Sequence, residues 1–198
     1  WRFEKGDINS SKCKLFRQKK INLPHTWNNL DGQDGENDYF RGTCYYYKKL
    51  GKIEKSSDEV IYLEFNGVSQ EATVYFNNEE VFHHEGGFST FRANITDQLV
   101  DGENTIIVSA DNSANDRVYS QMADFTFFGG IYRNVYIIEA PAVRFDLDYL
   151  GGEGVKVTPI VNEDGSATVT VESYITGATD GGTVKCDILC DGEVVATA

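Results

Sequence analysis

Hydrophobic and polar residues alternate along most of this 198-residue chain with a period of two, the pattern of strands that bury one face. The segment 59–68 places Ile61, Leu63 and Phe65 on one face, and the segment 131–138 alternates in the same way. No long segment carries apolar residues at the i, i+3, i+4, i+7 spacing of an amphipathic helix. The pattern therefore predicts an all-β protein.

Turn residues divide the first 140 residues into roughly seven or eight predicted strands, the number that suits a two-sheet sandwich or jelly roll. Asn77 and Asn78 lie between two β-rich arms over 71–84. Asparagine tolerates the positive φ of a tight two-residue turn, so we expect a hairpin there. A helical turn is expected over 96–99, with Thr96 as its cap.

Pro141 marks a predicted domain boundary, because aromatic residues become rarer beyond it. Three later segments alternate cleanly between Gly and Asp turns: 155–161, 166–175 and 183–198. They resemble the first strands of an immunoglobulin-like sandwich, which usually needs about 100 residues. We predict a jelly-roll β-sandwich over 1–140 and an incomplete immunoglobulin-like β-sandwich over 141–198, and we expect an excised piece of a longer protein.

Charge and composition exclude several partners. The formal net charge is −13, and an acidic surface repels phosphate backbones, so we expect no nucleic acid. No apolar run approaches the roughly 18–20 residues of a membrane helix, so we expect no membrane partner. The cysteines form no C-x-x-C pair and are interpreted as buried free thiols, which leaves the compartment open: Cys13, Cys44, Cys186 and Cys190.

Candidate metal ligands give a weak signal. His83 and His84 are neighbours on a predicted strand, so their side chains point to opposite faces and cannot share one ion. The Asp-rich loops 31–38 and 111–116 offer the oxygen ligands of a structural calcium ion, but their spacing matches no defined calcium loop. We therefore predict no metal site and no required cofactor.

Five blocks occur in an order that resembles the N-terminal sugar-binding domain of glycoside hydrolase family 2, the β-galactosidase and β-glucuronidase family. The blocks are WRF, LPHTWNNLDG, DYFRGTCYYYKKL, the stretch from Phe65 to Ser113, and FFGGIYRNVYI. The resemblance covers roughly residues 1–140. It implies retaining hydrolysis of terminal β-glycosides, in which one carboxylate attacks the anomeric carbon and another serves as acid and then base. Family members carry both glutamates on a later (β/α)₈ barrel, so we expect no catalytic residue in this chain.

The same resemblance implies two substrate-binding residues. In β-galactosidases of the family, a carboxylate just before the Gly-Ile-aromatic-Arg strand binds the non-reducing sugar, and Asp124 occupies that position. Its loop would be shaped by Phe125, Phe127 and Phe128. Arg41 stands about where some β-galactosidases place an asparagine near the same subsite.

From the residues alone, other roles stay open. Asp124 could cap a turn or pair with Arg133, and Arg41 could brace its loop. Trp27 could be a sugar platform, although we favour a place in the sandwich core.

We therefore expect the non-catalytic N-terminal portion of a retaining family 2 exo-glycosidase, first of all a β-galactosidase. The expected partners are a β-galactoside-type carbohydrate, the barrel domain of the same chain and, in a homo-oligomer, a second copy. A divalent cation in the intact protein is compatible with this expectation, but no residue here supports one. The alternatives are an autonomous carbohydrate-binding module without hydrolase activity and a purely structural sandwich.

Overall fold

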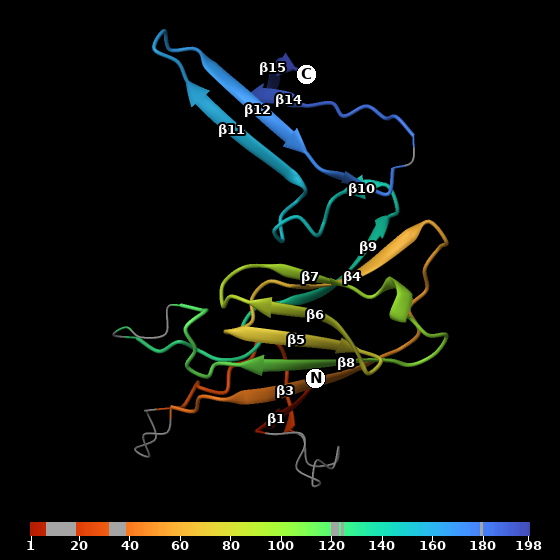
Figure 1. The fold of residues 1–198 in the computed structure, drawn as a ribbon, viewed down its shortest axis with the longest axis vertical. Helices are drawn as coiled ribbons and strands as arrows, with labels where there is room; N and C mark the ends of the chain where they lie inside the picture. Colours follow the sequence, from red (N-terminus) through yellow and green to blue (C-terminus); the bar gives the residue numbers. More distant parts are fainter. Residues whose placement is uncertain (7–18, 32–38, 120–122, 124, 179) are drawn as a thin grey trace. The chain divides into compact units, whose positions relative to one another are not determined.

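The computed structural model describes residues 1–6, 19–31, 39–119, 123, 125–178 and 180–198. They form two compact units, Trp1–Ala140 (unit 1) and Pro141–Ala198 (unit 2), shown in Figure 1. The predicted all-β fold is confirmed, because strands dominate both units and the described residues include only one short 3-10 helix, η2 (Thr96–Gln98). No helix in these described ranges has the length and apolar character needed to cross a membrane.

Unit 1 contains two sheets. One has the antiparallel order β2-β1-β3-β8-β5-β6, and the other has the order β7-β4-β9. The strands are β1 (Arg2–Lys5), β2 (Lys19–Lys20), β3 (Thr43–Leu50), β4 (Glu59–Phe65), β5 (Glu71–Phe76), β6 (Glu79–Glu85), β7 (Phe91–Asn94), β8 (Asn104–Asp111) and β9 (Val135–Pro141).

The core of unit 1 lies between these sheets. Tyr46, Val74 and Val108 of the larger sheet and Ile61 and Leu63 of the smaller sheet are fully buried in one cluster. Each such side chain contributes about 1.5–3 kcal/mol by leaving water. The sequence pattern therefore identified the buried face of β4 correctly, and the two-sheet sandwich is the predicted architecture.

The turn between β5 and β6 is the predicted Asn-Asn turn, with φ of 49° at Asn77 and 71° at Asn78. Asn77 Nδ2 also donates to the carbonyl of Gln98, at 2.8 Å. The cap prediction for Thr96 was wrong, because η2 has no side-chain cap. Thr96 Oγ1 instead accepts a hydrogen bond of 2.9 Å from the backbone N–H of Ile61 in β4.

The glycine pair before β9 is explained by close packing. A Cβ at Gly129 would collide with the indole ring of Trp27. Gly130 has φ of +118°, and a Cβ there would lie 2.5 Å from the hydroxyl of Tyr46. Strand β9 begins at Val135, later than the alternation suggested, and Gly130 forms only an isolated bridge to Ser69.

His25 lies at the edge of the core. Its ring centroid is 4.7 Å from that of Phe3, and its Nδ1 is 2.9 Å from the hydroxyl oxygen of Tyr46. Burial first, and then the positive charge of Lys19, lower the pKa of His25 below its ordinary value of 6.5.

We expect unit 1 to lose stability below about pH 6.5 through His25. A lowered folded-state pKa means that the unfolded chain binds this proton more readily, so the free energy of unfolding falls with pH and levels off below the folded-state pKa. Urea midpoints at pH 7.5 and 5.5 should therefore differ less for His25→Gln than for the wild type. Burial also lowers the pKa of His84, so part of the dependence should remain. An unchanged difference in His25→Gln would contradict the assignment.

Unit 2 consists of three antiparallel strand pairs. They are β10 (Arg144–Phe145) with β13 (Ile175–Thr176), β11 (Val155–Val161) with β12 (Ala167–Ser173), and β14 (Asp187–Cys190) with β15 (Glu193–Thr197). Apolar side chains such as Val157, Ile160 and Leu189 are exposed on these hairpins.

Three of the four cysteines fall within the described residues, and all three are free thiols: Cys44, Cys186 and Cys190. The prediction that they are buried is correct for Cys44 and wrong for Cys190, which is exposed in β14 (Asp187–Cys190). Cys13 lies outside the described residues. Burial raises the pKa of the Cys44 thiol to about 12, so it stays protonated at neutral pH and acts as a small apolar side chain of the core.

Candidate functional site

Three loops of unit 1 meet where β3 begins and β8 ends. They are residues 26–31, 39–42 and 127–131, and with Asn112 they form what we call the loop cluster. Two asparagines hold it together, and their side chains are almost completely shielded, with exposed fractions of 1% for Asn28 and 2% for Asn112. Buried amides are stable only when they are hydrogen-bonded, so their partners define the site.

Asn28 joins all three loops. Its Nδ2 donates to Asp31 Oδ2 at 2.6 Å and to the carbonyl of Phe40 at 3.0 Å. Its Oδ1 accepts a hydrogen bond of 2.8 Å from the backbone N–H of Gly129. One side chain therefore fixes the backbone of two loops that are separated by about ninety residues of sequence.

Asn112 fixes the remaining backbone groups beside Arg41. Its Oδ1 accepts from the N–H of Gly42 at 2.9 Å, and its Nδ2 donates to the carbonyl of Phe40 at 3.2 Å. The N–H of Phe40 donates to Asp31 Oδ2 at 3.0 Å. Arg41 thus lies between two residues whose backbone is held by buried side chains.

The side chain of Arg41 is half-buried and lies against the ring of Tyr39, with 5.3 Å between the guanidinium carbon and the ring centroid. The Tyr39 hydroxyl donates to the carbonyl of Phe127. Burial is the main cause that raises the pKa of Tyr39, so the hydroxyl keeps its proton for this bond. Tyr39 therefore links Arg41 to the loop that follows Asp124.

Asp124 itself lies outside the described residues. Of the aromatic residues after it, Phe127 is buried, whereas Phe125 and Phe128 are 68% and 46% exposed. The Phe125 and Phe127 rings are in contact, with centroids 4.9 Å apart. The structure therefore brings Arg41 to the base of the loop that carries Asp124, while the position of the Asp124 side chain remains a prediction.

Two other candidates have structural roles. Arg133 donates from one guanidinium nitrogen to the carbonyls of Asn66 and Phe88, both at 3.1 Å, and so ties two loops together. Trp27 is buried in the core cluster, as predicted, and its indole N–H donates to the carbonyl of Phe40 at 3.4 Å.

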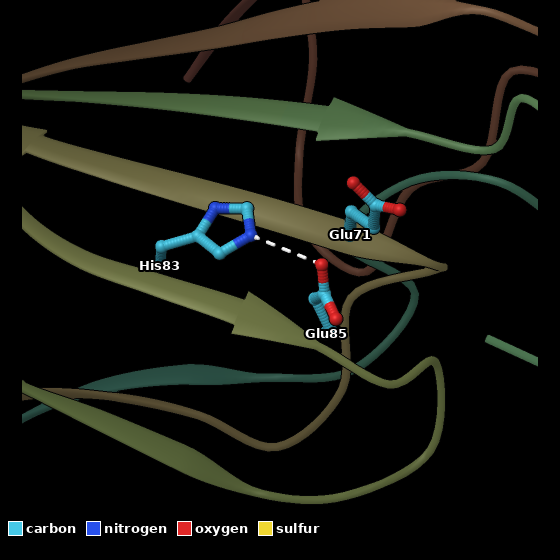
Figure 2. Close-up of side chains that lie close together, drawn as sticks. All are labelled: Glu71, His83 and Glu85. Atoms are coloured by element: carbon cyan, nitrogen blue, oxygen red, sulfur yellow. Dashed lines mark ion pairs between the residues drawn. The ribbon is translucent and has the colours of Figure 1, made fainter. Parts of the chain in front are cut away.

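A possible metal-ligand group lies elsewhere on the sheet, in the β5–β6 hairpin. Figure 2 shows Glu71 of β5 close to His83 and Glu85 of β6. Their ligand atoms lie within 4.8 Å of one another, and His83 Nε2 is 3.7 Å from Glu85 Oε1. The register that pairs Glu71 with Glu85 creates this group, whereas His84 stacks on Phe91 on the opposite face, as the strand alternation predicted.

These carboxylates already have a cationic partner. Arg117 Nη2 lies 2.6 Å from Glu71 Oε1, and Arg117 Nε lies 2.7 Å from Glu85 Oε1. Asn115 Nδ2 also donates to Glu71 Oε1, at 2.8 Å. Hydrogen bonding from Arg117 is the main cause that lowers the pKa of Glu85. The group is therefore an ion-pair clamp around Arg117, and its donor set does not favour a metal ion.

In the Asp-rich segment 111–116, the carboxylate of Asp111 is hydrogen-bonded to other groups of the protein. Asp111 accepts hydrogen bonds from the Thr43 hydroxyl and from the N–H of Ser113, the latter at 2.6 Å. Burial acts to raise the pKa of Asp111, but the hydrogen bonds from Ser113 and Thr43 lower it overall. Residues 32–38 of the other Asp-rich loop lie outside the described residues, so the calcium hypothesis gains no support.

The sandwich and its loop cluster define an all-β domain that presents polar groups from loops on a rigid scaffold, a common arrangement in binding domains. The family model of the glycosyl hydrolases family 2 sugar-binding domain matches residues 29–141. The chain belongs to glycosyl hydrolase family 2, as the resemblance implied.

Relatives include enzymes named for two different sugars. The chain is 32% identical over 173 residues to a β-glucuronidase of Bacteroides fragilis, covering 86% of this chain and 25% of that protein. It is 29% identical over 144 residues to a β-galactosidase of Thermoanaerobacter pseudethanolicus, covering 69% of this chain and 19% of that protein. The crystal structure of a Bacteroides uniformis β-glucuronidase matches it with a TM-score of 0.82 at 31% identity, covering 100% of this chain and 24% of that chain. The chain thus spans a quarter or less of the length of these relatives.

Proposed function

We propose that this chain is the non-catalytic N-terminal portion of a family 2 glycoside hydrolase and that its loop cluster helps to bind the terminal sugar of a β-glycoside. The observation that carries the proposal is the buried Asn28 network, which fixes the backbone on both sides of Arg41 and anchors the loop after Asp124. Substrate-binding side chains need a rigidly held backbone of this kind, because small displacements weaken hydrogen bonds to a ligand. The nucleophile and the acid would come from the rest of the intact protein.

Asp124 and the exposed aromatic residues have complementary chemistry for a sugar. A carboxylate accepts charge-assisted hydrogen bonds from sugar hydroxyls, which are stronger than neutral ones. The exposed rings of Phe125 and Phe128 can cover the apolar C–H face of a sugar ring. Asp124 would thus orient the sugar, while the rings exclude water from one side.

For the sugar, we propose a β-glucuronide first and a β-galactoside second. Relatives named for either sugar cover most of this chain, 86% for a β-glucuronidase and 98% for a β-galactosidase of Bacteroides ovatus, so the ranking does not rest on coverage. Arg41 is the feature that favours an acidic sugar, because a guanidinium group binds a carboxylate through two parallel hydrogen bonds. This ranking reverses the expectation from the sequence, in which a β-galactoside came first.

We expect Asp124→Ala in the intact protein to lower kcat/KM about 10- to 100-fold, since a hydrogen bond to a charged acceptor contributes roughly 1.5–3 kcal/mol. The measurement uses p-nitrophenyl β-D-glucuronide and p-nitrophenyl β-D-galactoside side by side. The wild type should have the higher kcat/KM on the glucuronide if the proposed ranking holds.

The matched control is Asp58→Ala, which removes an exposed carboxylate from a turn before β4. Both variants should keep the wild-type thermal midpoint, and only Asp124→Ala should lose activity. Wild-type kinetics for Asp124→Ala would remove this residue from the sugar subsite. Galactoside binding by the isolated chain would instead favour the autonomous binding module.

A further inference from the structure

Two further loops of unit 1 reach the end of the sandwich that carries the loop cluster. Glu71, the first residue of β5, lies opposite Asp111, the last residue of β8, and opposite Glu85, the last residue of β6. The loops before β5 and after β6 therefore lie at the end of the larger sheet where β8 ends (Figure 1). Side chains on these loops are placed to contact a ligand that extends beyond the loop cluster.

Hydrogen bonds join the two loops to the segment before β9. Ser69 and Gly130 exchange two backbone hydrogen bonds, of 3.0 and 3.2 Å. The hydroxyl of Tyr132 donates to the carbonyl of Gly87. Because Gly130 belongs to the loop cluster, these bonds make the joined loops continuous with it. We call the joined segments the Arg133 platform: residues 66–70, 86–89 and 132–134.

Arg133 is held in one orientation on this platform. Its Nη1 donates to the carbonyls of Asn66 and Phe88, both at 3.1 Å, and its guanidinium carbon lies 5.3 Å from the ring centroid of Tyr132. A Cβ at Gly67 would lie 3.1 Å from Cδ of Arg133, so the side chain packs directly on that backbone. A guanidinium group that is already ordered loses little conformational entropy when it binds a ligand.

The contacts of Nη1 leave one edge of the guanidinium group open. Arg133 is exposed, and its Nε and Nη2 form no hydrogen bond or ion pair within the described part of the chain. The N–H groups of Nε and Nη2 are parallel, and such a fork matches the two oxygens of a carboxylate. The open edge therefore favours a planar anion over a single hydroxyl group.

An exposed aromatic ring lies on the same platform. Phe88 is 56% exposed, although its backbone carbonyl is fixed by Arg133. A ring of this kind covers the C–H face of a sugar or packs against another ring. The platform thus combines one oriented cation with one apolar surface.

A buried amide of the platform has an unused acceptor. The exposed fraction of Gln70 is 3%, and its Oε1 has no hydrogen-bond donor among the described residues. Its Cγ would lie 3.7 Å from a Cβ at Gly87, which places the side chain next to the residue before Phe88. Buried polar atoms of native proteins nearly always have a partner. The platform therefore contains an acceptor that the chain itself does not use.

We propose that the Arg133 platform binds the aglycone, the group linked to the terminal sugar, and selects an aglycone that carries a carboxylate. This inference rests on the proposed function, since it extends the sugar site at the loop cluster. The carboxylate accepts hydrogen bonds from Nε and Nη2 of Arg133, while the ring of Phe88 covers the apolar face of the same group. A uronic acid unit and an aromatic acid share this chemistry.

The platform is close enough to the loop cluster for one substrate to contact both. Arg133 follows Ile131, the last residue of the loop cluster, by two residues, so their Cα atoms are at most about 7 Å apart. A terminal sugar bound at the loop cluster therefore leaves the next unit of the substrate near the platform.

A carboxylate side chain from the rest of the intact protein is the competing partner for the open edge. Such an ion pair would be present with every substrate and would affect acidic and neutral substrates equally. A contact with the aglycone, by contrast, changes only the hydrolysis of substrates that carry the carboxylate. The ratio of kcat/KM for an acidic substrate to that for its neutral counterpart separates the two roles.

The test measures this ratio in the intact protein for two pairs of substrates. One pair is the 4-carboxyphenyl β-glycoside and its carboxamide, and the other is a disaccharide that ends in glucuronic acid and its glucuronamide form. The terminal sugar is the one whose p-nitrophenyl β-glycoside the wild type hydrolyses faster. In at least one pair the acid should have a kcat/KM about tenfold higher than the amide, and the preference should fall between about 50 and 300 mM NaCl. The pair that shows the preference identifies the aglycone, and equal values in both pairs overturn the proposal.

Variants locate the preference. Arg133→Gln should lower the ratio of acid to amide by about fivefold or more, and so should Arg133→Lys, because an ammonium group cannot form the fork. Phe88→Ser keeps the carbonyl that Arg133 contacts and should lower kcat/KM for both members of the pair. The control Lys55→Gln removes one positive charge at an exposed position outside the platform and should keep the wild-type ratio.

Two results with the variants would overturn the proposal. A ratio unchanged in Arg133→Gln, even with a lower Tm and an equal loss on acid and amide, would assign Arg133 to a contact within the protein. An equal fall of the ratio in Lys55→Gln would mean that only the overall charge matters.

Failure of the proposed function is distinguishable from failure of this inference. Asp124→Ala should lower kcat/KM for acid and amide alike and so keep the ratio. An intact protein that hydrolyses no β-glycoside would overturn both proposals, whereas normal hydrolysis of the amides without a preference for the acids would overturn this one alone.

Discussion

Replacing Gly129 with alanine should destabilise unit 1 by about 3 kcal/mol or more, a large part of the roughly 5–15 kcal/mol that stabilises a domain. The new methyl group would collide with the ring of Trp27 and lie 2.8 Å from Nδ2 of Asn112. Neither side chain has room to withdraw, because both are buried. Overpacking a core typically costs about 1–3 kcal/mol, and a displaced Asn112 would leave buried hydrogen-bonding groups unpaired at a further cost of about 1–3 kcal/mol.

A thermal melt of the intact protein, followed by near-ultraviolet circular dichroism, measures this effect. A loss of about 3 kcal/mol corresponds to a fall of roughly 6–12 °C in Tm for a domain of this size. Gly51→Ala is the control, because a Cβ at Gly51 meets nothing within 4 Å. A Gly129→Ala variant that melts with the wild type would show that Trp27 does not pack against this glycine.

The second large effect is expected from the buried asparagines. Asn28→Ala and Asn112→Ala should each destabilise the protein by about 2–4 kcal/mol, because each removes hydrogen bonds from buried backbone groups. The Asn28→Ala substitution removes the side-chain acceptor of the Gly129 N–H. The Asn112→Ala substitution removes that of the Gly42 N–H. Both side chains also donate to the same carbonyl, that of Phe40.

Because the two residues share a partner, the double variant should lose less than the sum of the single variants. Urea unfolding of the two single variants, the double variant and the wild type gives this interaction energy. The exposed Asn134→Ala serves as the control and should stay within about 0.5 kcal/mol of the wild type. Strict additivity would contradict a single network. At temperatures where all variants are folded, kcat/KM should also fall in the network variants, since Arg41 would lose its fixed backbone.

Local patterns predicted the features that depend on local chemistry. The alternation of residues in β3 places Cys44 and Tyr46 on one face, and both are buried, whereas Tyr45 and Tyr47 are half-buried on the other side. The Asn77-Asn78 turn was predictable for the same reason, because the positive φ angles are a property of the turn residues themselves.

Features that depend on distant partners could not be predicted in this way. Asn28 and Asn112 are 84 residues apart, and nothing beside either one in the sequence shows that their side chains meet. The only local hint was a pair of asparagines directly after Trp27 in an otherwise apolar block. Thr96 had the composition of a cap, but a backbone donor of β4 uses its hydroxyl instead.

The ion-pair clamp shows the same limit. From the sequence, the candidate metal ligand considered beside His83 was its neighbour His84. The strand register instead places His83 beside Glu71 and Glu85. Arg117 joins the group from a loop more than thirty residues later. The family resemblance, by contrast, depended on ordered blocks along the chain, which a sequence displays directly.

The division between Phe127 and its exposed neighbours has an evolutionary consequence. Tyr39 and Asn28 hold the loop at Phe127 and Gly129, while Phe125 and Phe128 contribute little to the buried core. Substitutions of Phe125 and Phe128 should therefore change the free energy of unfolding very little, whereas substitutions of Tyr39 and Asn28 should lower it. A lineage could retune the sugar that its loop accepts without first acquiring compensating mutations, so recognition can diverge faster than the scaffold beneath it.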